Sequence, residues 1–284
     1  MTAGAISSLG FIGAGSMAEA LMQGVISTGL APPDRITVTN RRDHGRLEAL
    51  RAKYGVCVGT KEDVAKASGT IIIAVKPKDM AEALSALREF LDGERHLLIS
   101  VAAGVSTSFI ESIAAGPGAS SSKGMAVIRA MPNVSSAVQE SATAISAGAF
   151  AGDEALGTAA GLFHSVGEVV FVEEGLLDAV TALSGSGPAY VYYMIEAMEK
   201  AGLTLGLAPD TARRLAAQTV FGASKLLLST GAEPSDLRAK VTSPGGTTMA
   251  AIESLAESGF QQAVGRAVAR AAERSRELGA AFSP

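Results

Sequence analysis

The chain has 284 residues, of which 48% are hydrophobic, and a mean hydropathy of +0.29. This length can bury one large or two medium cores, and Gly, Pro or charged residues interrupt every apolar run well before the about 20 residues that cross a bilayer. Charges of both signs are interspersed, with a net charge of −4, so we expect a soluble protein that has neither a membrane nor nucleic acid as a partner.

The first residues and the single cysteine indicate a compartment. No Lys or Arg precedes the first apolar stretch, which argues against a signal peptide and favours a cytoplasmic location. Cys57 is the only cysteine, so an internal disulfide is excluded, as is usual in a reducing compartment. Because Cys57 lies between Val56 and Val58, we expect a small buried strand residue, with a catalytic thiol as the alternative.

A glycine-rich turn between a strand and a helix opens the chain. Residues 6–12 predict a strand, and residues 17–27 have the spacing of an amphipathic helix. Between them, Gly13 permits a tight turn, Gly15 lets a pyrophosphate approach the backbone, and the small Ala18 lets helix and strand pack closely. Free N–H groups at the helix start would hold the anion. We therefore expect a dinucleotide site, with a glycine turn that binds no ligand as the alternative.

Strands and helices then alternate as far as residue 172. Apolar or β-branched runs predict strands at residues 35–39, 56–58, 70–75, 96–101, 125–131, 142–147 and 168–172. Helical patterns fall between them: a charged segment up to residue 54, residues 63–67, an Ala- and Leu-rich segment up to residue 90, residues 106–115 and residues 154–164. Residues 116–124 predict a surface loop to which no function is assigned. This pattern predicts an α/β fold with a doubly wound, Rossmann-type, largely parallel sheet, whose ligands lie beyond the carboxyl ends of the strands.

The second part of the chain predicts helices and almost no strand. We place the boundary near Glu174, which gives a dinucleotide-binding domain at residues 1–173 and an all-helical domain at residues 174–284 that dimerises and binds substrate. Residues 188–198 and 215–228 are too apolar around the circumference of their predicted helices to be one-sided surface helices. A surface helix normally has one apolar face, so we expect these helices to be covered in a homodimer.

The end of the second predicted strand indicates which dinucleotide binds. Many NAD sites place an acid about 20 residues beyond the glycines, whereas this chain has Asn40, Arg41 and Arg42. An acid would repel a 2′-phosphate, but guanidinium and amide groups would hold it. We therefore expect NADP to be the preferred cofactor and NAD to be a possible one. Two solvated arginines at the start of the next helix are the alternative.

One polar loop stands out in the predicted helical domain. Residues 241–248 read Val-Thr-Ser-Pro-Gly-Gly-Thr-Thr and lead into a predicted helix at residues 249–255. Proline and small residues at a helix start expose several N–H groups, which form a natural seat for a carboxylate. An N-cap with flexible glycines explains the same residues without a ligand. His44, His96 and His164 fall in separate predicted elements, so each is expected to be structural or exposed, and no ligand spacing predicts a metal.

Taken together, these motifs resemble the pyrroline-5-carboxylate reductase family over essentially the whole chain. The segments that carry the resemblance are Phe11-Ile12-Gly13-Ala14-Gly15-Ser16-Met17, Ala74-Val75-Lys76-Pro77, Ala102-Ala103-Gly104, Arg129-Ala130-Met131-Pro132-Asn133, Leu183-Ser184-Gly185-Ser186-Gly187-Pro188-Ala189-Tyr190 and Lys240-Val241-Thr242-Ser243-Pro244-Gly245-Gly246-Thr247-Thr248. The resemblance implies reduction of the C=N bond of 1-pyrroline-5-carboxylate to L-proline with NADPH or NADH, the last step of proline biosynthesis. It also implies a homodimer with intertwined helical domains, often assembled further into a decameric ring.

The resemblance also implies the site residues. The substrate would be held by Ser243, Gly245, Gly246, Thr247 and Thr248. The cofactor would be held by Ile12, Gly13, Ala14, Gly15, Ser16, Met17, Asn40, Arg41, Arg42, Ala74, Val75, Lys76, Pro77, Ala102, Gly104 and Asn133. The chain departs from the family at Val134-Ser135, where Thr-Pro is usual, so the contacts of that loop differ.

The lack of an obvious catalytic acid fits imine reduction. A carbonyl reductase normally has a His, Tyr or Lys donor, but a cyclic imine can arrive already protonated at nitrogen. A fixed carboxylate and one hydroxyl near the ring nitrogen then suffice, and we expect Thr248 to supply that hydroxyl. Two rivals remain: a β-hydroxyacid dehydrogenase, which would need Lys225 or Lys240 as its catalytic lysine, and a nucleotide-sensing protein without activity, against which the intact loop at residues 243–248 argues.

Overall fold

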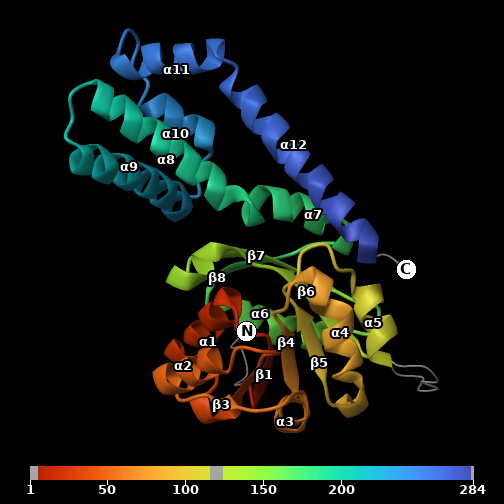
Figure 1. Ribbon diagram of the computed structural model, residues 1–284. Coiled ribbons are helices and arrows are strands. Elements are labelled where there is room, and N and C mark those ends of the chain that lie inside the picture. Colours follow the sequence, from red (N-terminus) through yellow and green to blue (C-terminus); the bar gives the residue numbers. More distant parts are fainter. Residues whose placement is uncertain (1–5, 116–123, 283–284) are drawn as a thin grey trace. The chain divides into compact units, whose positions relative to one another are not determined.

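The computed structural model describes residues 6–115 and 124–282 (Figure 1). The predicted loop at residues 116–124 therefore lies, up to residue 123, outside the described residues. Within the described part, the chain forms two compact units: residues 6–186 with 270–282 are unit 1, and residues 187–269 are unit 2. The strands expected before residue 173 all lie in unit 1, together with residues 174–186.

Unit 1 is built on one eight-stranded sheet in the order β3-β2-β1-β4-β5-β6-β7-β8. Its strands are β1 (Leu9–Ile12), β2 (Ile36–Thr39), β3 (Cys57–Val58), β4 (Thr70–Ile73), β5 (Leu97–Ser100), β6 (Ala126–Met131), β7 (Ser141–Ala147) and β8 (Gly167–Phe171). Every neighbouring pair is parallel except β6 and β7, which are antiparallel. The predicted largely parallel sheet is confirmed.

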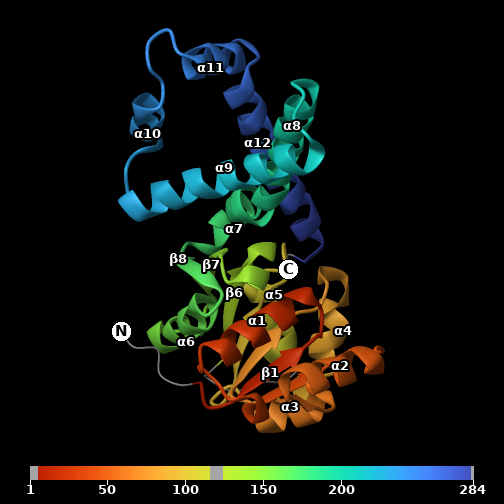
Figure 2. The same ribbon diagram turned by 90° about the vertical axis from the view of Figure 1, so that its left-hand side faces the viewer.

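Helices cover both faces of this sheet (Figures 1 and 2). They are α1 (Ser16–Ser27), α2 (His44–Tyr54), α3 (Lys61–Ala67), α4 (Met80–Ser85), α5 (Thr107–Ala115), α6 (Asp153–His164) and α7 (Leu177–Val180). One core cluster includes residues of α1, α2 and α6, and a second includes residues of α3, α4 and α5. Along β4, Ile71 and Ile73 belong to the second cluster and Ile72 to the first. This division explains why the strand is apolar without alternation.

Two local predictions are corrected. Cys57 is exposed, not buried, because β3 has only two residues and lies at the edge of the sheet. The helix expected up to Phe90 ends at Ser85 and is followed by a short 3-10 helix (Arg88–Phe90). Leu84 and Leu87 are both fully buried, and the N–H of Leu87 donates to the carbonyl of Leu84 over 3.0 Å, a bond of the 3-10 type that tightens the chain after α4.

Unit 2 contains helices only, as far as residues 187–269 are concerned. These are α8 (Gly187–Thr204), α9 (Pro209–Thr230), α10 (Pro234–Lys240), α11 (Thr247–Glu257) and the first half of α12 (Phe260–Gly279). Helices α8 and α9 pack against each other, yet only Ala212 and Ala216 are buried in this unit. No described helix of the chain combines the length and the apolar character needed to span a bilayer.

The end of α12 is part of unit 1. Ser275, which is buried, donates from its hydroxyl to Oδ1 of Asp178 over 2.6 Å. Beyond the helix, the ring of Phe282 meets that of Phe109 edge to face, with 5.7 Å between the ring centroids. These contacts attach the C-terminal segment to α7 and α5.

Candidate functional site

The turn between β1 and α1 depends on two glycines with different surroundings. Gly13 has a φ of +109°, and its N–H donates to the carbonyl of Thr39 over 2.8 Å. A Cβ on Gly13 would clash with the carbonyl oxygen of Ala74 and would lie 2.8 Å from its carbonyl carbon. Gly15, by contrast, has an ordinary φ of −74°, and a Cβ there would meet nothing within 4 Å. Gly13 is therefore required by the protein itself, whereas Gly15 leaves open space beside the turn.

The start of α1 offers unpaired amides at this open space. Gly15 is the N-cap residue, no side chain caps the helix, and Glu19 makes the first bond of the ladder, to the carbonyl of Gly15. The N–H groups of the first turn consequently have no intrahelical acceptor. Amides at the N-terminus of a 12-residue helix form a seat for a phosphate or pyrophosphate.

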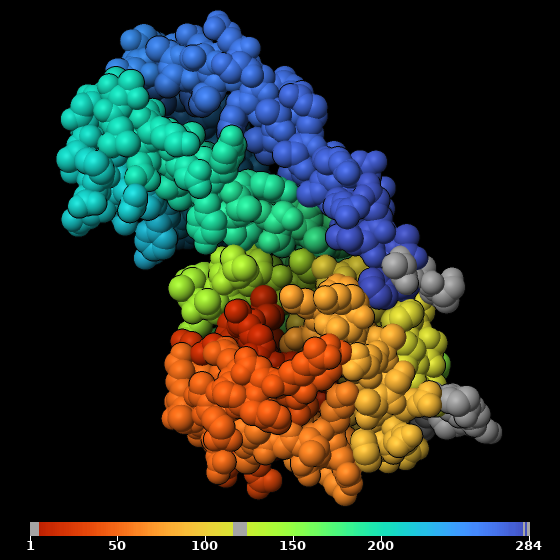
Figure 3. Space-filling view, in the orientation of Figure 1, coloured from red at the N-terminus to blue at the C-terminus, as the bar shows by residue number. Residues whose placement is uncertain are grey.

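A cavity of about 290 Å³ lies beyond the carboxyl ends of β1, β2 and β4. Figure 3 shows this face of unit 1, where the red and orange surfaces of the N-terminal segments adjoin. Its lining residues are Ile12, Gly13, Thr39, Asn40, Arg41, Lys61, Ala74, Val75, Lys76, Lys78, Asp79, Glu82 and Ala83. Seven of the residues expected at a cofactor are thus brought together: Ile12, Gly13, Asn40, Arg41, Ala74, Val75 and Lys76. Crevices at this edge of a doubly wound sheet are where nucleotides bind.

The polar groups at the end of β2 have partners within the protein. Asn40 and Asp43 bond each other twice, from Nδ2 to the carbonyl of Asp43 at 2.8 Å and from the N–H of Asp43 to Oδ1 at 3.1 Å. The guanidinium of Arg41 pairs with the carboxylate of Glu82 and lies 3.8 Å from that of Asp79. Arg42 is exposed. Lys61, Lys78, Asp79 and Glu82 were not among the expected residues. Lys78 and Asp79 directly follow the expected Pro77, whereas Lys61 and Glu82 reach the cavity from α3 and α4, which only the fold brings together.

A second set of residues, which the sequence did not indicate, supports the turn between β1 and α1. Arg46 in α2 donates from Nε to the carbonyl of Ala14 over 3.0 Å and pairs with Glu19 in α1. Lys53 and the hydroxyl of Tyr54 also bond Glu19, at 2.9 Å and 3.0 Å. Arg46, followed by Lys53, lowers the pKa of Glu19 to about 2, so this carboxylate is charged at neutral pH. The network holds α1, α2 and the Ala14 carbonyl in one arrangement.

Three residues implied for the cofactor make close contacts with the protein. Ala102 is buried at the end of β5. Gly104 has a φ of +75°, and a Cβ there would lie 3.1 Å from Cα of Gly279. The side chain of Asn133 donates to the carbonyl of Ser184 and accepts from the N–H of Ser135, both at 3.0 Å. Among the residues that line the cavity, none of these three is present.

The predicted substrate loop is a tight turn that leads directly into α11. Pro244 and Gly245 occupy its centre, with Gly245 at φ +71°, and the N–H of Gly246 donates to the carbonyl of Ser243 over 3.0 Å. Proline followed by a residue with positive φ is the pattern of a type II turn. Gly246 is then the N-cap of α11, without a side-chain cap.

The start of α11 therefore presents free donors. The first bond of the helix runs from the N–H of Ala250 to the carbonyl of Gly246, so the three preceding amides have no intrahelical acceptor. Thr248 is half-buried and Thr247 is exposed. Within the described part of the chain, neither threonine hydroxyl has a hydrogen bond, whereas Thr242 nearby donates to the carbonyl of Arg238 over 2.7 Å. A helix start of this kind offers free donors to an anion, with hydroxyls beside it for a further contact.

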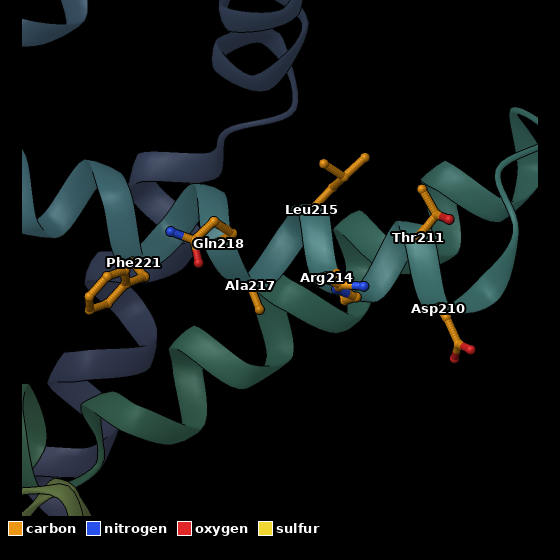
Figure 4. Close-up of a pocket in the computed structure, with 7 residues that line it drawn as sticks. All are labelled: Asp210, Thr211, Arg214, Leu215, Ala217, Gln218 and Phe221. Carbon is orange, nitrogen blue, oxygen red and sulfur yellow. The ribbon is translucent and has the colours of Figure 1, made fainter.

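A second cavity, in unit 2, does not contain any expected site residue. It has a volume of about 650 Å³ and borders α9 alone, along Asp210, Thr211, Arg214, Leu215, Ala217, Gln218 and Phe221 (Figure 4). Residues of a single helix cannot enclose a small molecule. We therefore interpret this cavity as an open helix face and not as a substrate site.

The histidines play the structural or surface roles that were expected. His96 is buried, its Nδ1 accepts from the N–H of Asp92 over 2.8 Å, and its Nε2 lies 3.0 Å from the carbonyl oxygen of Ala65. His44 and His164 are exposed at the ends of α2 and α6. Over residues 6–115 and 124–282, His, Cys, Asp and Glu form no group that could hold a metal ion.

Comparison with known families assigns a description to each part of the chain. Residues 174–278 match the family model described as pyrroline-5-carboxylate reductase dimerisation. Residues 8–104 match the model described as NADP oxidoreductase coenzyme F420-dependent. The first match indicates self-association, and the second covers the glycine turn and every residue that lines the cavity.

Relatives cover nearly the whole chain. Pyrroline-5-carboxylate reductase 2 of Bacillus subtilis is 42% identical over 277 residues, which is 97% of this chain and 96% of that protein. The solved structure of a pyrroline-5-carboxylate reductase from Coxiella burnetii is 35% identical, with a TM-score of 0.88 over 96% of this chain and 98% of that one. The Plasmodium falciparum pyrroline carboxylate reductase, solved with NADP bound, is 25% identical, with a TM-score of 0.82 over 97% and 99%. At these identities and coverages, the chain belongs to the pyrroline-5-carboxylate reductase family.

Proposed function

We propose that this protein reduces the C=N bond of 1-pyrroline-5-carboxylate to L-proline with NADPH, the last step of proline biosynthesis, and accepts NADH less well. The observation that carries the proposal is the pair of anion seats on one chain: the turn and helix start at Gly15 and the turn and helix start at Gly246. The first suits a pyrophosphate and the second a small carboxylate. The relatives reported above have the same activity in their names.

The residues around the first seat fit a dinucleotide. The open space at Gly15 lets a phosphate approach the amides of Ser16 and Met17. Asn40, Arg41 and Arg42 would hold the ribose and its 2′-phosphate. The remaining contacts are proposed for Ile12, Gly13, Ala14, Ala74, Val75, Lys76, Pro77, Ala102, Gly104 and Asn133. When bound, the reduced nicotinamide supplies a hydride.

The second seat would hold the substrate. Its carboxylate would accept hydrogen bonds from the Ser243 hydroxyl and from the free amides of Thr247 and Thr248, which are fixed by the turn and by α11. Thr248 would then hydrogen-bond the ring nitrogen with its hydroxyl. Because a cyclic imine can bind already protonated at nitrogen, the site needs no strong acid. Its contribution is to position the imine and to stabilise the charge changes at nitrogen.

The decisive test compares two substrates. NADPH oxidation, followed by absorbance, should be rapid with 1-pyrroline-5-carboxylate and absent with the keto form of a 3-hydroxy acid. The reverse result would favour a β-hydroxyacid dehydrogenase, for which Lys225 or Lys240 would have to be the catalytic lysine. Oxidation with neither substrate, in a protein that still binds NADPH, would favour a nucleotide-sensing protein.

Replacing both strand-end arginines tests the cofactor assignment. We expect Arg41→Ala with Arg42→Ala to raise KM for NADPH by about tenfold or more, because charge-assisted hydrogen bonds to the 2′-phosphate are lost. KM for NADH should change much less, since NADH has no phosphate at that position. Steady-state kinetics with both cofactors make the comparison, and equal effects would contradict the phosphate assignment.

We further propose that residues 174–284 form a dimerisation and substrate-binding domain after a cofactor domain at residues 1–173. The match to the dimerisation model begins at residue 174. Unit 2 has almost no core of its own, and α8 exposes the consecutive side chains Val191, Tyr192, Tyr193 and Met194. Four consecutive residues point to all sides of a helix, so covering them requires a second copy that packs around α8. The open face of α9 in Figure 4 adds Leu215 and Phe221 to this apolar surface.

The dimer should be obligate. We expect the protein to remain dimeric, or to assemble further into a decameric ring, at the lowest concentration that light scattering coupled to size exclusion can measure, because apolar surface of this extent is poorly tolerated in water. Activity should be lost together with the dimer on dilution or mild denaturation. A fully active, stable monomer would contradict this proposal. A cytoplasmic location is proposed for the assembly, on the composition alone.

A further inference from the structure

The cavity at the end of β2 contains both signs of charge. Arg41, Lys61, Lys76 and Lys78 contribute the cations, and Asp79 and Glu82 contribute the carboxylates. Among the described residues, the three lysines form no ion pair, whereas Arg41 pairs with Glu82. Of the four cations that line the cavity, the one at the end of β2, where a 2′-phosphate would bind, is therefore the one already held by a carboxylate.

Glu82 reaches Arg41 from a different element. Arg41 follows β2 and Glu82 lies in α4, and both side chains line the cavity. Asp79, immediately before α4, lies 3.8 Å from the same guanidinium nitrogen. The acid that many NAD sites carry at the end of the second strand is thus absent from that strand but is presented to the same place by α4.

We propose that Glu82 is a specificity-determining residue, which competes with the 2′-phosphate of NADPH for Arg41 and so limits the preference for NADPH over NADH. A carboxylate and a phosphate offer the same kind of oxygen acceptor to a guanidinium. Both cannot occupy the same donors of Arg41. The inference rests on the proposed function, since it assumes that the cavity binds a nicotinamide dinucleotide.

The exposure of the pair sets the size of the effect. The side chains of Arg41 and Glu82 are 48% and 60% exposed, and ion pairs of this exposure are weak. A phosphate, with a charge of about −1.5 to −2 at neutral pH, can therefore displace Glu82 at a small cost. NADH brings no phosphate and leaves the pair intact. Glu82 should consequently reduce NADPH affinity by a small factor and leave NADH affinity nearly unchanged.

Binding of nucleotide fragments tests the proposal without the reductase reaction. Calorimetric titration of the full chain with 2′,5′-ADP and with 5′-AMP compares a ligand that has the 2′-phosphate with one that lacks it. We expect Glu82→Gln to tighten 2′,5′-ADP binding by about two- to fivefold and to leave 5′-AMP binding unchanged. The ratio of kcat/KM for NADPH to that for NADH should rise by the same factor.

Two matched variants isolate the role of the pair. Glu89→Gln removes an equal charge from the segment after α4, and Glu89 does not line the cavity, so it should leave binding of both nucleotides unchanged. In an Arg41→Ala background, Glu82→Gln should lose its effect, because a double-mutant cycle removes contributions that do not pass through the partner.

Several results would overturn the proposal. Equal tightening of both nucleotides, or an effect that persists without Arg41, would assign Glu82 a general influence on the charge of the cavity. No change in 2′,5′-ADP binding on Glu82→Gln would show that the carboxylate does not compete. If the unaltered protein bound neither nucleotide, the proposed cofactor site would be wrong, and the proposed function with it. The other results concern Glu82 alone, so the two kinds of failure can be told apart.

Discussion

Gly13→Ala is expected to lower the free energy of unfolding by about 2 to 6 kcal/mol, from backbone strain and overpacking combined. The φ of +109° is disfavoured for any residue with a Cβ. The added methyl group would also meet the carbonyl of Ala74. That carbonyl cannot move easily, because Ala74 and Gly13 are both fixed by backbone hydrogen bonds, to Ile12 and Thr39. The strain would fall on the junction of β1, β2 and β4.

Gly15→Ala separates the needs of the fold from those of the cofactor. Its φ is ordinary and a methyl group there would meet nothing within 4 Å, so we expect the midpoint of thermal unfolding to stay close to that of the unaltered protein. The methyl group would, however, occupy the space through which a pyrophosphate reaches the amides. KM for both NADPH and NADH should rise, since both share this group.

Thermal unfolding and steady-state kinetics of the two variants together give a clear outcome. Gly13→Ala should lose both stability and cofactor affinity, and Gly15→Ala only the second. A Gly15→Ala protein with unchanged KM for both cofactors would show that the open space beside the turn does not receive a pyrophosphate. A Gly13→Ala protein of full stability would contradict the close contact with Ala74.

Local patterns predicted most of unit 1. The glycine turn is a short-range feature: Gly13, which needs a positive φ, and Gly15, the N-cap of α1, are two positions apart. The strand at residues 70–73 could be predicted because a run of isoleucines serves two cores, one on each face of the sheet. Cys57 was misjudged because Val56 and Val58 indicate a strand but not its place at the sheet edge, which depends on long-range strand order.

The composition of the cavity could be predicted only in part. Asn40 and Arg41 follow a predicted strand at a known distance from the glycines, so a local rule identified them. No such local rule identifies Glu82 or Arg46. Glu82 is 41 positions from its partner Arg41 in the sequence, and Arg46 is 32 positions from Ala14. Only the packing of α2 and α4 against the sheet determines those contacts. Local rules therefore predicted part of the cavity lining, but not the residues that reach it or its supporting turn from other elements.

Thr248→Ala is expected to lower kcat by about tenfold to a hundredfold, which corresponds to the loss of one hydrogen bond of roughly 1.4 to 2.7 kcal/mol. Thr248 is half-buried at the start of α11, and its hydroxyl has no hydrogen bond to any residue that the structure describes. A hydroxyl without a structural partner is available to a ligand. KM for the imine should change less than kcat, because the carboxylate is held by amides that the substitution leaves in place.

Thr248→Val tests whether the hydroxyl itself is responsible, because valine has the shape of threonine and lacks only its hydrogen-bonding group. If the hydroxyl bonds the ring nitrogen mainly as the hydride arrives, the valine variant should lose as much kcat as the alanine variant, with KM for NADPH, thermal stability and the dimer unchanged. These controls matter because Thr248 lies in a helix start whose geometry depends on the turn at Pro244 and Gly245. An unchanged kcat in Thr248→Val would make the hydroxyl dispensable, and the loop at residues 243–248 would then act only as a carboxylate clamp for an imine already protonated at nitrogen.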